Sequence, residues 1–113
     1  MSFSSLEHLK PNAKFLVIAK ITFPLNSTKA DEFEQRGLAM QKAVNSGKEP
    51  GTLMFRLSRG ISPDERHKFT GLEEYANKEA YEQHQTSEAF EALTASKVLE
   101  SADTQRIFRQ ECV

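Results

Sequence analysis

The chain has little of several features that mark other protein classes. Its single cysteine, Cys112, excludes an internal disulfide and any metal site built from several cysteines. Lys and Arg total 15 against 16 Asp and Glu, which argues against a nucleic-acid or acidic-membrane partner. The longest apolar stretch, Phe15 to Ala19, is strand-sized and too short to cross a membrane. The N-terminus has no apolar signal-peptide segment, which predicts a cytoplasmic protein.

Length and composition predict one folded domain. A chain of 113 residues can bury a single core without disulfides. Residues 1–13 have a mixed composition and are predicted to form an N-terminal tail, and residues 14–113 to form the domain. The three histidines, His8, His67 and His84, are scattered without metal-ligand spacing, so we expect no metal site.

Hydrophobic periodicity predicts four strands and two helices. β-branched and aromatic residues or alternating patterns place strands at residues 15–23, 52–59, 66–75 and 104–113. Between the first two strands, apolar residues recur at spacings of three and four, typical of a helix of about 18 residues. That face consists of Ala30, Phe33, Gly37, Met40 and Val44. Asn77 is predicted to cap the second helix, which restarts at Ser87 after a break.

The order β-α-β-β-α-β predicts an α+β protein with the ferredoxin-like fold. Such a fold is one antiparallel sheet with both helices on the same face. The first strand carries Leu16 and Ile18 on the side opposite Phe15 and Val17, so both of its sides are expected to be partly buried. Since so short a chain encodes no third layer, we expect a homodimer in which the open sheet faces pack together.

The second half of the chain contains an ordered series of residues that resembles a known family. The series matches E-P-G, an aromatic, F-x-x-x-E-x-[YW], A-x-x-x-H and [ST]-x-x-F. It consists of Glu49-Pro50-Gly51, Phe55, Phe69, Glu73, Tyr75, Ala80, His84, Ser87 and Phe90. These residues resemble the antibiotic biosynthesis monooxygenase (ABM) domain over about residues 14–111. The resemblance implies a dimeric α+β barrel made of ferredoxin-like subunits.

Several activities are implied by the resemblance. Members include cofactor-independent oxygenases of anthrones and quinols, haem-degrading enzymes, isomerases of small sugar phosphates and proteins without a known activity. Haem-degrading members carry a Trp in the pocket and an Asn on the first strand, whereas this chain has no Trp and residues 14–23 contain no Asn. We therefore expect a monooxygenase without a cofactor that oxidises a small aromatic, anthrone or quinol-type molecule with O2. The alternatives are a non-catalytic ligand-binding or stress-associated protein and a small-metabolite isomerase.

The candidate catalytic residues are His84, Tyr75 and Glu73. Histidine suits proton transfer because imidazole titrates near neutral pH. In this hypothesis Tyr75 donates a hydrogen bond to the substrate, and Glu73 orients either of the other two. Gly71 leaves a gap in its strand for a flat ring, between apolar walls supplied by Phe55, Phe69, Phe90, Met40 and Leu53.

Each of these residues also has a structural interpretation. The histidine can donate to a backbone carbonyl, and the tyrosine can pack its ring and expose its hydroxyl. Glu73 can cap or pair with a nearby base, Gly71 can mark a β-bulge, and the phenylalanines can simply fill the core. The sequence leaves the functional and structural interpretations open.

Overall fold

One four-stranded sheet, with the strand order β2-β3-β1-β4 and every neighbouring pair antiparallel, organises the molecule. The computed structural model describes residues 6–112. The strands are β1 (Phe15–Thr22), β2 (Thr52–Arg59), β3 (Lys68–Tyr75) and β4 (Asp103–Gln110). The helical segments are α1 (Lys29–Ala43), its π-helical continuation η2 (Val44–Lys48), α2 (Lys78–Gln85) and α3 (Glu88–Ser96).

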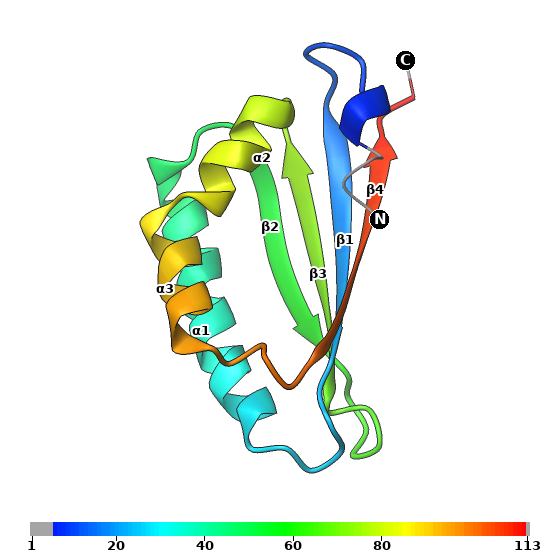
Figure 1. Ribbon diagram of the computed structural model, residues 1–113, viewed down its shortest axis with the longest axis vertical. Helices are drawn as coiled ribbons and strands as arrows, with labels where there is room; N and C mark the ends of the chain where they lie inside the picture. Colours follow the sequence, from blue (N-terminus) through cyan, green and yellow to red (C-terminus); the bar gives the residue numbers. More distant parts are fainter. Residues whose placement is uncertain (1–5, 113) are drawn as a thin grey trace.

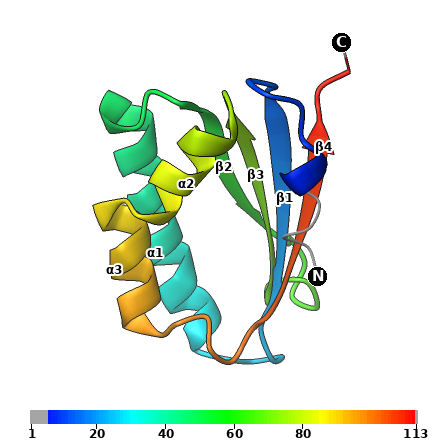
Figure 2. The same ribbon diagram turned by 45° about the horizontal axis from the view of Figure 1, so that its top comes forward.

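The helices lie together on one face of the sheet. Figures 1 and 2 show α1, α2 and α3 against the same side, while no helix of residues 6–112 covers the other side. Strand β1 lies between β3 and β4, so the chain crosses over the sheet through α1. The predicted α+β, ferredoxin-like subunit with an antiparallel sheet is confirmed.

The periodicity of β1 and α1 explains how these two layers meet. Alternate residues of β1, beginning at Phe15 and Val17, are buried beneath the helices. The predicted apolar face of α1 is buried, but the α-helix is shorter than expected and ends at Ala43. Val44, the last member of that face, belongs to the π-helical turn, which closes around Gly47 at a φ of 93°.

Helix α1 begins differently from the prediction. Thr28 occupies the N-cap position, but its side chain makes no capping hydrogen bond. The Ser27 hydroxyl instead accepts a hydrogen bond from the backbone N–H of Lys29, at 3.1 Å. Asp31 and Glu32 lie in the first turn, where their charges are favourable to the helix dipole.

The other strands differ from the predictions at their ends. Strand β3 begins at Lys68, because Arg66 and His67 belong to the preceding turn. Strand β4 starts at Asp103 and stops at Gln110; residue 113, predicted as its end, lies outside the described residues. In β2 the pairing with β3 shifts between Thr52 and Met54, which interrupts the predicted alternation at Leu53.

Two side-chain caps fix the α2 and α3 segments. The Asn77 side chain accepts a hydrogen bond from the backbone N–H of Ala80, at 2.9 Å. The Ser87 hydroxyl accepts one from the backbone N–H of Phe90, at 3.2 Å. These caps explain the predicted start at Asn77 and the restart at Ser87. Helix α2 buries Ala80, Tyr81 and His84, so the histidine is carried on its sheet-facing side.

The segment before β1 also contacts the core. Leu6 is buried against Phe15 and Tyr81, near the β1–β4 side of the sheet. The predicted tail, residues 1–13, is therefore packed on the domain at Leu6, while its first five residues lie outside the described residues.

The uncovered sheet face carries several apolar side chains. Leu16 and Leu72 are 39% and 42% exposed, and Ile18, Ile107 and Met54 are partly exposed on the same face. Within residues 6–112, no helix has the length and apolar character needed to span a membrane.

Candidate active site

A hollow between the sheet and the helices begins at a row of small residues. The strand pairing aligns Leu57, Gly71, Ala19 and Arg106 across the helix-facing side of the sheet. Gly71 and Ala19 occupy the middle of this row, where larger side chains would fill the space beneath the helices. A Cβ atom at Gly71 would lie 3.6 Å from both Ala19 Cβ and Glu73 Oε2, so the glycine is not required by steric conflict.

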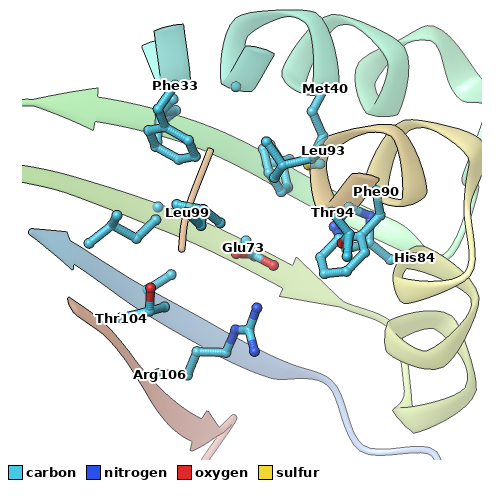
Figure 3. A pocket seen from close by; sticks show the side chains of 16 residues that line it. Phe33, Met40, Glu73, His84, Phe90, Leu93, Thr94, Leu99, Thr104 and Arg106 are labelled. Carbon is cyan, nitrogen blue, oxygen red and sulfur yellow. The ribbon is translucent and has the colours of Figure 1, made fainter. Parts of the chain in front are cut away.

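The resulting cavity is mostly apolar and small. It measures about 80 Å³, below the roughly 300–1,000 Å³ typical of ligand sites. Figure 3 shows Phe33 and Met40 of α1, and Phe90, Leu93 and Thr94 of α3, around it. Its polar groups are therefore few, and each has a large share in deciding what binds. They belong to Glu73, His84, Thr94, Thr104 and Arg106.

His84 and Glu49 form a hydrogen-bonded pair at one wall. His84 Nδ1 lies 2.7 Å from Glu49 Oε1, and the two side chains are 2% and 12% exposed. An ionised carboxylate only accepts hydrogen bonds, so Nδ1 carries the proton that it donates to Glu49. In the neutral ring, Nε2 then has a free lone pair and is the ring nitrogen left to the cavity. Thr52 donates a further hydrogen bond to the same Glu49 oxygen, at 3.3 Å.

Aromatic rings hold the imidazole in place. The His84 ring centroid lies 5.4 Å from that of Phe55, 5.4 Å from Phe90 and 5.8 Å from Tyr75. These contacts and the bond to Glu49 fix the orientation of the ring before a ligand arrives. A fixed histidine with one nitrogen held by a carboxylate is suited to accept a proton at the other nitrogen.

Glu73 and Tyr75 form a second pair on β3. The Tyr75 hydroxyl donates a hydrogen bond to Glu73 Oε1. Burial raises the pKa of Glu73 above its ordinary value, although the Tyr75 hydrogen bond and the positive charge of Arg106 act in the opposite direction. Burial, together with the neighbouring Glu73 charge, raises the pKa of Tyr75 far above its usual range. Tyr75 therefore stays a neutral hydrogen-bond donor.

Strand β4 supplies the remaining polar groups. Figure 3 shows the Thr104 and Arg106 side chains rising from β4 toward the cavity, with Arg106 on the side of Glu73. Because β4 is an edge strand, these residues lie beside the open border of the sheet.

Comparison with known proteins identifies the family. Residues 15–96 match the family model described as antibiotic biosynthesis monooxygenase. The chain belongs to the ABM family. A comparison with curated protein sequences finds no match.

Solved structures of ABM-like proteins share the fold. One from Caulobacter crescentus CB15, named for this family, has 24% identity and a TM-score of 0.75, covering 90% of this chain and 92% of that chain. A Pseudomonas aeruginosa protein has 21% identity and a TM-score of 0.73, covering 94% and 99%. A Deinococcus radiodurans protein named for the family has 17% identity and a TM-score of 0.70, covering 88% and 93%. At these identities the likeness concerns the fold alone.

The ABM fold brings most, though not all, of the predicted site residues to one cavity. The residues that line it are Met40, Phe55, Gly71, Glu73, His84 and Phe90. Phe69 does not line the cavity but packs edge-on against Phe33 and beneath the Arg59 guanidinium. Leu53 is 45% exposed at the β2 bulge, so its prediction as a cavity wall is wrong.

The structure also changes two predicted partnerships. Tyr75 is fully buried and its hydroxyl is bonded to Glu73, so the predicted direct hydrogen bond to a substrate is not what the structure shows. The acid that holds His84 is Glu49, whereas Glu73 was the predicted orienting residue. From the sequence, Glu49 was expected only to form part of a turn.

Two functional candidates were missed by sequence reasoning, Glu49 and Arg106. Glu49 lies 35 positions before His84, and its position beside α2 depends on the β2–β3 pairing and on the hydrogen bond from Ala76 N–H to the Gly51 carbonyl. Arg106 had a usable signal, because alternation in β4 places it on the same face as Phe108, opposite the small Ala19.

The part of the chain from residue 6 to 112 contains no cluster of three or more His, Cys, Asp or Glu side chains arranged for a metal ion.

Proposed function

We propose that this ABM-family protein is a cofactor-independent monooxygenase that oxidises a small aromatic, anthrone or quinol-type molecule with O2. The observation that carries the proposal is the buried His84–Glu49 pair, which presents one imidazole nitrogen to an apolar cavity. An oxygenase without a cofactor needs a substrate that supplies the electrons itself, and such a substrate becomes reactive when it loses a proton.

His84 is the proposed base. Its Nε2 accepts a proton from a phenol O–H or an activated C–H, while Glu49 stabilises the imidazolium that forms. The apolar walls exclude water, so the substrate anion is not quenched by solvent before it meets O2. Glu73 lies at the same cavity and is held by Tyr75, so its protonated form is placed to donate a hydrogen bond to an oxygen of the substrate.

The oxidation balances without an added reductant. At an activated ring CH2 group, the carbanion transfers electrons to O2 and a carbon–oxygen bond forms. Loss of water from the resulting hydroperoxide then leaves a C=O group. The net change is CH2 + O2 giving C=O + H2O, so one oxygen atom enters the product and the other leaves as water. The substrate supplies all four electrons.

Cavity size favours the smaller members of the substrate class. Because the space is only about 80 Å³, a single-ring quinol fits it with less rearrangement than a three-ring anthrone. The α3 residues at the wall, including Phe90 and Leu93, are only partly buried, so a larger substrate would displace them first.

Oxygen consumption tests the proposal. Metal-stripped protein is supplied with hydroquinones, anthrones and other electron-rich phenols in an oxygen-electrode cell. His84→Gln is the main variant, because its side-chain amide still donates to Glu49 but is not a base. We expect its rate to fall by about 10²–10⁴-fold, whereas His8→Ala, at an exposed histidine remote from the cavity, should keep the parent rate.

The outcomes separate the candidate functions. Uptake by the parent and by His8→Ala, but not by His84→Gln, supports the oxygenase. Equal uptake by the parent and His84→Gln contradicts the assigned base. Ligand-induced thermal shifts without uptake would replace the oxygenase by a binding protein or an isomerase.

The uncovered sheet face supports a second part of the proposal, a homodimer. ABM-family proteins are generally dimeric. Here Leu16, Leu72 and Ile107 form an apolar strip on a face without helices, and a second copy would cover it. Glu74 and Arg109 flank Leu16 on this face, and a two-fold arrangement would bring opposite charges together. We place this dimer in the cytoplasm, in keeping with the expectation from the N-terminal sequence.

A further inference from the structure

Arg106 is a cation that the proton-transfer chemistry does not use. It is the only lysine or arginine among the residues lining the cavity, all of which belong to the described part of the chain. Its side chain rises from the edge strand β4 and is partly buried. Within residues 6–112 it takes part in no ion pair, even though Glu73 lines the same cavity.

The acids near Arg106 have other partners. Glu73 accepts the Tyr75 hydroxyl, and Glu49 accepts His84 Nδ1–H. The other inward or surface arginine with close carboxylates, Arg59, is bound by Asp31 and Glu34 at 2.9 and 2.7 Å. Arg106 thus contrasts with Arg59, whose positive charge is already neutralised within the fold.

The strand pairing fixes where an anion held by Arg106 would place the rest of a ligand. Arg106 is paired with Ala19, and Ala19 with Gly71, so two strand spacings separate Arg106 from the glycine. At about 4.8 Å per spacing this is roughly 10 Å, the length of a benzoate-sized molecule. A ring attached to the anion therefore lies over the small residues Ala19 and Gly71, in the hollow bounded by His84 and Phe90.

We propose that Arg106, assisted by the Thr104 hydroxyl, is a carboxylate-recognition site, and that the natural ligand is a small aromatic acid. This inference rests on the proposed function, because it names the substrate class of the same cavity. A guanidinium donates two parallel hydrogen bonds to the two oxygens of a carboxylate. Since no second cation lines the cavity in the described residues, the site matches a monoanion better than a phosphate.

Binding measured without oxygen tests the inference separately from turnover. The probes are 2,5-dihydroxybenzoate and hydroquinone, which share the quinol ring and differ in the carboxylate. Isothermal titration under argon prevents consumption of either compound. We expect the parent to bind the carboxylate at least about tenfold more tightly than the neutral quinol.

Variants on the same strand show whether Arg106 causes the preference. Arg106→Gln should remove it and leave hydroquinone binding unchanged, and Arg106→Lys should retain part of it because the charge stays but the fork is lost. Arg109→Gln is the matched control, since Arg109 is exposed and lies on the opposite face of β4. Circular dichroism confirms that each variant is folded.

Several results would overturn the inference. These are equal affinity of the parent for the two probes, no binding of the carboxylate, and an unchanged preference in folded Arg106→Gln. The proposed oxygenase fails in a different way. Arg106-dependent binding without oxygen uptake would refute the reaction and keep the carboxylate site, and uptake without that dependence would refute the site alone.

Discussion

Gly71→Ala should make the protein more stable and less able to bind its ligand. The added methyl group would lie 3.6 Å from Ala19 Cβ and Glu73 Oε2, which are ordinary contacts. Gly71 has no positive φ, so alanine suits its backbone. Replacing a glycine at such a position typically stabilises by about 0.4–1 kcal/mol, because the unfolded chain loses freedom. For a domain of this size the midpoint of thermal unfolding should rise by about 2–8 °C.

The same methyl group occupies the floor of the cavity. In a space of about 80 Å³ it displaces a ring from the row that joins Arg106 to Leu57. We therefore expect weaker binding of a quinol by isothermal titration, alongside the higher melting temperature by calorimetry. Stability and binding would change in opposite directions, which general damage to the fold does not produce.

A second glycine provides the control for this prediction. Gly47 has a φ of 93°, and a Cβ atom added to it would meet no other atom within 4 Å, so alanine there is strained by the backbone alone. Gly47→Ala should lower the melting temperature, at a cost of about 1–2 kcal/mol, and leave ligand affinity unchanged. The reasoning is refuted if Gly71→Ala binds the quinol as tightly as the parent, or if it melts at a lower temperature.

Three further predictions concern the charged pairs and the open face. Glu49→Gln should slow oxygen uptake at least about tenfold, because an amide stabilises the imidazolium of His84 less than a carboxylate does; an unchanged rate would separate Glu49 from catalysis. Since the folded-state pKa of Glu73 is raised, the stability this group contributes is complete below pH 4.5 and is lost as the pH rises through the folded pKa. Urea unfolding from pH 4 to 8 should therefore show Glu73→Gln gaining on the parent as the pH rises, and parallel curves would contradict this. Leu72→Glu should convert a dimer into a monomer by light scattering, whereas Ile61→Glu, at a loop residue 95% exposed, should not; a monomeric parent would refute the dimer.

Local patterns predicted the fold because each element carries its own signal. The alternation in β1 and the three-to-four spacing in α1 both report which side faces the core, and the side chains of Asn77 and Ser87 mark the helix starts. The end positions were less accurate, because turns decide them. His67, for example, alternates with Phe69 in sequence but belongs to the turn before β3.

The site was only partly predictable because its polar partners come from distant positions. His84, Glu73 and Gly71 could be proposed from one short stretch of chain. The pairing of His84 with Glu49 depends on how β2 sits beside α2, which no local pattern reports. The bulge at Leu53 likewise depends on the register of β2 against β3.

The most direct test of the central claim is the origin of the new oxygen atom. Metal-stripped protein is given a quinol that it consumes, under ¹⁸O₂ in ordinary water, and the product is analysed at once by mass spectrometry. The account predicts one ¹⁸O atom in each product molecule, and no such product with His84→Gln. A product without ¹⁸O, or one labelled equally by the parent and by His84→Gln, would contradict a monooxygenase that works through this histidine.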